Sequence, residues 1–146
     1  MALKFIEWMG LPDTPESLGG PSTGGRTVEQ VKVIVQHVER TGYAHVGLVL
    51  VDSKSGKPWQ NHQVLACGVL RSDDARVELR VYDPNYPGRD DIKVVAEFGS
   101  DQGGNAIARS RMWIGDRERG VRGFFLMPYE PRTPPEAVGG PRRSRT

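Results

Sequence analysis

Cysteine is nearly absent from this chain, because Cys67 is the single one among 146 residues. One cysteine cannot form an internal disulfide, and it excludes a metal site built from several cysteines. Long apolar runs are also missing. No stretch approaches the roughly 18 consecutive apolar residues of a membrane-spanning helix, and no charged start is followed by the apolar segment of a signal peptide. We therefore expect no membrane partner and, from this absence of signals alone, a cytoplasmic location.

A large charge of one sign is missing too. The formal net charge is only +2, and the arginines are spread out apart from a cluster near the C-terminus, so no nucleic-acid partner is expected. The apolar fraction of 37% is low, while 18 glycines and 11 prolines are many, which indicates that much of the length is loop or tail. We expect one domain over residues 1–130, followed by a disordered tail rich in proline and arginine over residues 131–146.

Two helices are expected near the start of the chain. Residues 2–9 carry enough apolar side chains for one or two helical turns, whereas residues 10–26 hold three prolines and five glycines and should be irregular. The clearest helix begins at Thr27, which forms a capping box with Gln30, and it ends at Gly42. Its apolar stripe consists of Val28, Val31, Ile34, Val35 and Val38.

The remainder of the chain is typical of strands. Residues 46–51 form a continuous apolar run, residues 62–83 fit a hairpin, and residues 92–98 alternate between apolar and polar side chains. Residues 106–114 fit a strand or an irregular segment, and residues 121–127 should form the last strand. This order predicts an α+β fold in which short N-terminal helices are followed by a mostly antiparallel curved sheet or open barrel of four to six strands.

The hairpin brings two polar residues together. If residues 72–75 form its loop, paired residue numbers sum to about 147, so that Val64 lies opposite Asp83 and His62 lies on the diagonal. Diagonal neighbours are roughly 7–8 Å apart at Cα, which lets a carboxylate reach an imidazole N–H. The predicted core face of the hairpin consists of Val64, Ala66, Val77, Leu79 and Val81, and its other face consists of Gln63, Leu65, Cys67, Val69, Glu78 and Arg80.

An imidazole oriented by an aspartate is two thirds of a nucleophilic triad, with His62 as the general base and Asp83 as its orienter. Each residue also has a structural interpretation, since a histidine at a strand end can hydrogen-bond a turn and an Asp-Pro-Asn step can cap backbone N–H groups. Cys67 does not supply the third member. It lies five residues from His62, which places it on the opposite face and roughly 16 Å along the strand. We expect it to be a small buried hydrophobe.

Two side chains are candidates for the lining of a substrate cleft, namely Asn61, which precedes His62, and Trp59, whose alternative role is packing. The acidic turn over residues 83–91 lacks the spacing of an EF-hand calcium loop. His37, in the predicted helix, and His45, before a predicted strand, have no second ligand at metal spacing. We therefore expect no metal site and no cofactor.

The hairpin resembles a known family. Residues 61–68 read Asn-His-Gln-Val-Leu-Ala-Cys-Gly, and residues 81–88 read Val-Tyr-Asp-Pro-Asn-Tyr-Pro-Gly. These segments resemble the C-terminal half of papain-like cysteine peptidases, nearest to the bacterial branch close to the C39 peptidases. The resemblance extends thinly over residues 1–130 and implies the sheet lobe of a papain-like fold. It also implies that His62 is the catalytic base and Asp83 its orienter.

The chain departs from that family in one respect. In the family the nucleophilic cysteine stands at the start of an upstream helix, shortly after a glutamine of the oxyanion hole, and a helix N-terminus lowers a thiol pKa. No cysteine precedes Cys67 here. The resemblance thus implies a truncated or incomplete hydrolase-type domain that is inactive alone. It would act on a peptide or acyl substrate only with a missing N-terminal segment or a second chain. Whether this chain is an enzyme stays open, and the alternative is a non-catalytic peptide-binding module that uses the cleft or a sheet edge.

Overall fold

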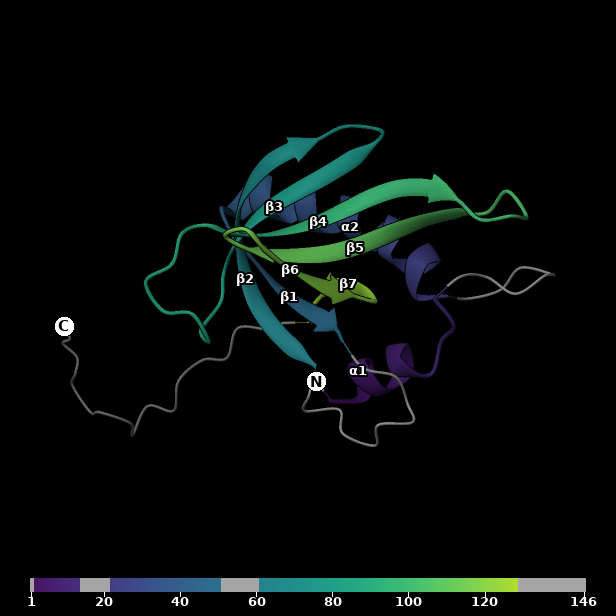
Figure 1. Cartoon of the computed structure of the whole chain (residues 1–146), viewed down its shortest axis with the longest axis horizontal. Coiled ribbons are helices and arrows are strands. Elements are labelled where there is room, and N and C mark those ends of the chain that lie inside the picture. The colour runs from purple at the N-terminus through teal and green to yellow at the C-terminus, as the bar shows by residue number, and fades with distance from the viewer. Residues whose placement is uncertain (1, 14–21, 51–60, 129–146) are drawn as a thin grey trace.

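The computed structural model describes residues 2–13, 22–50 and 61–128. These form two helices and one seven-stranded sheet (Figure 1). The helices are α1 (Ala2–Met9) and α2 (Thr23–Thr41), and the strands are β1 (Ala44–Val49), β2 (His62–Ser72), β3 (Arg76–Tyr82), β4 (Ile92–Ser100), β5 (Ala106–Ile114), β6 (Arg117–Val121) and β7 (Gly123–Leu126).

The sheet is curved and antiparallel throughout, with the strand order β6-β5-β4-β3-β2-β1-β7. Helices that precede a run of antiparallel strands make this an α+β fold, as predicted. The tail expected over residues 131–146 lies outside the described residues.

The two helices cover opposite faces of the sheet at β1 and β7. Leu48 and Phe124 pack in the same cluster as Ile34 of α2, whereas the next residues in each strand, Val49 and Phe125, pack with α1. Successive strand residues point to opposite faces, so the sheet is sandwiched between α2 and α1 in this region. The aromatic cluster on the α1 side consists of Phe5, Trp8 and Phe125, with ring centroids 5.2 and 5.1 Å apart for the two pairs that include Phe125.

Helix α2 begins four residues earlier than the sequence pattern indicated. Ser22 is the N-cap, in an extended conformation, and its hydroxyl accepts a hydrogen bond from the Gly25 N–H at 2.9 Å. The predicted capping box of Thr27 and Gln30 is therefore wrong, since the Thr27 hydroxyl instead donates to the Thr23 carbonyl inside the helix at 2.7 Å. Gly24 fits the first turn because it lies so close to its neighbours that a Cβ would come within 2.7 Å of the Asp13 carbonyl.

The rest of the prediction for α2 is confirmed. Val31, Ile34 and Val38 are buried against the sheet, and Val28 and Val35 are partly buried beside them. Gly42 ends the helix with a left-handed φ of 91° and donates its N–H to the Val38 carbonyl, which is the usual role of glycine after a helix.

The predicted register of the β2–β3 hairpin holds at its open end and shifts toward its turn. Leu65 pairs with Tyr82 and Ala66 with Val81, as predicted, but two irregularities follow, between Ala66 and Gly68 and between Val69 and Arg71. Each inserts an extra residue into β2, as β-bulges do.

The first shift reverses the predicted side of one residue. Val69 now pairs with the buried Leu79 and packs against the core, so its assignment to the outer face was wrong. The predicted core residues of the hairpin, Val64, Ala66, Val77, Leu79 and Val81, are all buried.

Strand β6 was not predicted, which is why seven strands are found instead of four to six. It follows β5 through a two-residue turn in which Gly115 has a φ of 63°. Residues 117–120 are all exposed, so this segment lacks the apolar alternation that reveals a strand. The Gly-Asp step of the turn was its one available signal.

Candidate functional site

His62 and Asp83 lie in contact at the open end of the β2–β3 hairpin. The His62 Nε2 atom is 2.6 Å from Asp83 Oδ1, which is a short hydrogen bond of the kind strengthened by a charged acceptor. His62 is the first residue of β2, and Asp83 follows the last residue of β3. The register near this end therefore brings the two residues together, as the sequence predicted.

Asp83 is held rigidly by the turn that it begins. Its side chain is 1% exposed, and the same Oδ1 atom accepts the N–H of Asn85 at 2.8 Å. Its carbonyl accepts the N–H of Tyr86 at 2.9 Å. Asp83 thus caps the turn and contacts His62 at once, so the structural and the orienting roles coexist in one carboxylate.

The imidazole of His62 links this buried carboxylate to the surface, since its side chain is 15% exposed. A carboxylate only accepts hydrogen bonds, so in the neutral ring Nε2 carries the proton and Nδ1 carries the lone pair. No partner of Nδ1 lies within the part of the chain that the structure describes. The arrangement presents Nδ1 as a proton acceptor whose orientation Asp83 sets.

Asn61 is engaged at the same end of the sheet. Its Oδ1 atom accepts the N–H of Leu50 at 2.7 Å, which joins the residue after β1 to the residue before β2. The residue is half-buried, and this hydrogen bond fixes the orientation of the Asn61 amide next to His62 in the chain. Trp59, the other candidate for the cleft, lies outside the described residues.

Cys67 is exposed, so the prediction that it is buried was wrong. Its thiol lies 3.6 Å from the Arg80 carbonyl, while its neighbour Ala66 is buried. The side chain therefore points away from the core because alternate residues of β2 face opposite sides. His62 shares the buried side with Val64 and Ala66 by the same alternation, so Cys67 cannot reach its imidazole.

A hollow of about 220 Å³ lies beside the open end of the hairpin. Its walls include Gln63 and the exposed Tyr82, whose strand neighbours Val64 and Val81 are buried, so the hollow opens on the face of the sheet opposite His62. Tyr82 was not among the predicted cleft residues, because an aromatic residue in a strand is more often a core residue.

The acidic turn after Asp83 contains an ion pair between Arg89 and Asp91. Arg89 contacts Asp91, with its Nε atom 2.8 Å from Oδ1, and this hydrogen bond holds the pKa of Asp91 below its usual range. Over residues 2–13, 22–50 and 61–128, no group of three or more histidine, cysteine, aspartate or glutamate residues is placed to hold a metal ion. None of the described helices is long and apolar enough to cross a membrane.

Comparison of the chain with protein-family models, curated proteins and solved structures yields no match. The case for a function therefore depends on the residues and their geometry.

Proposed function

We propose that this chain is the base-and-orienter half of a cysteine-hydrolase-type site like that of papain-like peptidases. His62 is the general base, Asp83 orients it, and the substrate is a peptide or acyl compound. The observation that carries the proposal is the 2.6 Å contact between His62 Nε2 and the buried carboxylate of Asp83.

The chemistry follows from the tautomer. With its proton held on Nε2, the ring can take a thiol proton only at Nδ1, and the resulting imidazolium is stabilised by the negative charge of Asp83. The thiolate then attacks an acyl carbon. Deprotonation of this kind typically contributes about 10²–10⁴-fold to a rate.

The nucleophile comes, on this proposal, from a segment outside this sequence or from a second chain. No cysteine precedes His62, and Cys67 points away from it. The chain alone is accordingly expected to hydrolyse neither peptides nor esters through a thiol of its own.

A small thiol can replace the missing nucleophile in a direct test. The purified chain is mixed with 2-mercaptoethanol and p-nitrophenyl acetate. His62 Nδ1 takes the S–H proton, sulfur attacks the ester carbonyl, p-nitrophenolate leaves, and the thioester forms. We expect the protein to accelerate p-nitrophenolate release in a thiol-dependent way, and His62→Ala to remove most of that acceleration.

Three variants make the result specific. His37→Ala removes a histidine of α2 that has no aspartate partner among the described residues, and it should keep the rate, as should Cys67→Ser. Asp83→Asn should lower the rate without changing the order in thiol. A rate that is the same in His62→Ala and in His37→Ala would disprove a base role for His62.

The alternative is a non-catalytic peptide-binding module, and one observation favours a particular edge for it. The β7 edge is already occupied, because the N–H of Leu126 donates to Gln30 Oε1 at 2.9 Å and that of Phe124 lies 3.4 Å from Thr27 Oγ1. The end strand β6 is exposed along residues 117–120. An extended peptide would add to β6 through backbone hydrogen bonds.

This alternative is tested by one proline. In a hairpin with a two-residue loop, the pair beside the loop, Ile114 and Arg117, exchanges hydrogen bonds, so the N–H of Glu118 points outward. Glu118→Pro should abolish saturable peptide binding while Glu118→Ala retains it. Binding that survives the proline would remove β6 from consideration.

A further inference from the structure

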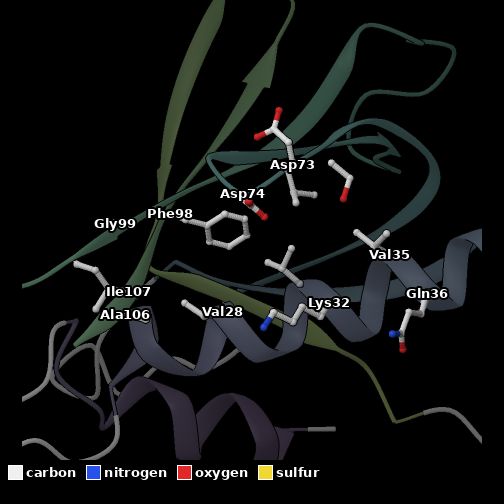
Figure 2. A pocket seen from close by; sticks show the side chains of 13 residues that line it. Val28, Lys32, Val35, Gln36, Asp73, Asp74, Phe98, Gly99, Ala106 and Ile107 are labelled. Atoms are coloured by element: carbon white, nitrogen blue, oxygen red, sulfur yellow. The ribbon is translucent and has the colours of Figure 1, made fainter. Parts of the chain in front are cut away.

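A second cavity lies at the other end of the hairpin from His62. It has a volume of about 500 Å³ and opens between α2, the turn that joins β2 to β3, and the adjoining ends of β4 and β5 (Figure 2). Seven residues of β3 at about 3.3 Å each put it roughly 20 Å from Asp83. The volume is in the usual range for small-molecule sites, about 300–1,000 Å³.

The floor and walls of this cavity are apolar. Val31, Val77 and Ile107 are buried at its base, and the partly buried ring of Phe98 lies between α2 and the β2–β3 turn in Figure 2. A hydrocarbon or aromatic group that enters the cavity would replace water on these surfaces, which favours binding in proportion to the apolar area covered.

Two opposite charges stand across the mouth. Lys32 projects from α2, and Asp74 projects from the facing turn (Figure 2). Neither side chain has an ion-pair or hydrogen-bond partner among the described residues. The other aspartate of the turn, Asp73, is fully engaged, since its Oδ1 atom accepts the N–H groups of Ala75 and Arg76 and its Oδ2 atom accepts from Arg71 at 2.6 Å.

We propose that this cavity binds a small zwitterion with an apolar body, of the class of dipeptides with apolar side chains. The carboxylate of the ligand pairs with Lys32, its ammonium pairs with Asp74, and its side chains cover Val77 and Phe98. A purely anionic ligand would meet the free carboxylate of Asp74, and a purely cationic one would meet the ammonium of Lys32. Only a ligand that carries both charges matches both groups.

The test is a calorimetric titration of the full chain with leucyl-phenylalanine. We expect saturable binding of one dipeptide per chain. Lys32→Gln and Asp74→Asn should each weaken it about tenfold or more, as expected for the loss of a hydrogen bond to a charged group. Glu29→Gln, which removes an exposed carboxylate from the same helix, should leave the affinity unchanged. Both test residues are exposed, so these variants should fold.

Capped ligands decide whether both charges matter. N-acetyl-leucyl-phenylalanine lacks the ammonium, and leucyl-phenylalanine amide lacks the carboxylate, so each should bind about tenfold or more weakly than the free dipeptide. The doubly capped compound, N-acetyl-leucyl-phenylalanine amide, lacks both charges. If it bound as tightly as the free dipeptide, the proposal would be overturned, as it would be if the dipeptide did not bind. If the cavity bound decanoate and not the dipeptide, the proposal would be overturned in favour of a fatty-acid ligand. His62→Ala should not change the titration, which keeps this test independent of the proposed hydrolase-type function.

Discussion

A buried carboxylate beside an imidazole is the central feature of this protein at the scale of residues. Asp83 is 1% exposed and has two partners for one oxygen, the imidazole of His62 and the N–H of Asn85. Burying a carboxylate is costly unless hydrogen bonds compensate it. The pair is therefore coupled, because removing either contact leaves the charge of Asp83 less compensated.

Replacing the charged Asp83 by a neutral residue should allow the His62 imidazole to adopt both tautomers. In Asp83→Asn the amide can donate to Nε2 as readily as accept from it, so we expect a mixture of tautomers where the wild type shows only the Nε2–H form. The free energy of unfolding should fall by about 1–3 kcal/mol. Nitrogen-15 NMR of the imidazole and urea unfolding measure the two effects, with His62→Ala to assign the signals. A spectrum identical to that of the wild type would mean that the two side chains do not meet in solution.

At the scale of elements, α2 does more than cover the sheet. Its Gln30 side chain accepts the outward N–H of Leu126 in β7 at 2.9 Å. An end strand with free N–H groups invites pairing with another chain. Helix α2 therefore blocks one edge of the sheet with side chains that the sequence pattern had suggested for capping.

Removing that blocking group should cost stability and solubility together. Gln30→Met leaves the half-buried N–H of Leu126 without its acceptor, so we expect a loss of about 1–3 kcal/mol in the free energy of unfolding and greater self-association. Gln36→Met makes the same change at an exposed position of α2 and should have little effect. Urea unfolding and light scattering at two protein concentrations provide the measurement. Equal behaviour of the two variants would show that the β7 edge is protected by other means.

At the scale of the whole molecule, the stability of the fold depends on pH through three carboxylates in turns. The pKa of Asp73 is lowered chiefly by the Arg71 side chain that donates to it, that of Asp91 by Arg89, and that of Asp101 by the Asn105 amide. A carboxyl group whose pKa is lower in the folded state stabilises the fold above its ordinary value of 3.8 and loses that effect as the pH falls through the lowered pKa.

We therefore expect the melting temperature to decline as the pH falls below 3.8, the ordinary carboxyl value. A triple variant, Asp73→Asn, Asp91→Asn and Asp101→Asn, should melt lower than the wild type at pH 7 and decline less steeply in acid. Thermal unfolding followed by circular dichroism, at pH 7 and at a series of pH values below 3.8, tests this. Parallel curves for the two proteins would assign the acid sensitivity to other groups.

Much of the secondary structure could be predicted because its signals are local. The stripe from Val28 to Val38 has helical spacing, Gly42 ends that helix, and the apolar alternation over residues 92–98 is found within β4. The start of α2 was misplaced because Thr27 and Ser22 are both good cap residues. Packing of Gly24 against the Asp13 carbonyl, a contact outside the helix, favours Ser22.

The candidate site was predictable for a similar reason. The pairing of Leu65 with Tyr82 and of Ala66 with Val81 follows from the lengths of two strands and one loop, and it places His62 beside Asp83. The bulges that return Val69 to the core were not predictable, because each inserts one residue and bends the strand without leaving a distinct residue pattern.

The sequence by itself determined the α+β class, the amphipathic stripe of α2 and the meeting of His62 with Asp83, because periodicity and hairpin register act over short stretches of chain. Only the tertiary structure decided which strands stand at the edges, which side chains protect them, and that Lys32 of a helix faces Asp74 of a turn. These depend on how a curved sheet wraps around α2, and that curvature brings together residues whose sequence separation carries no signal of contact.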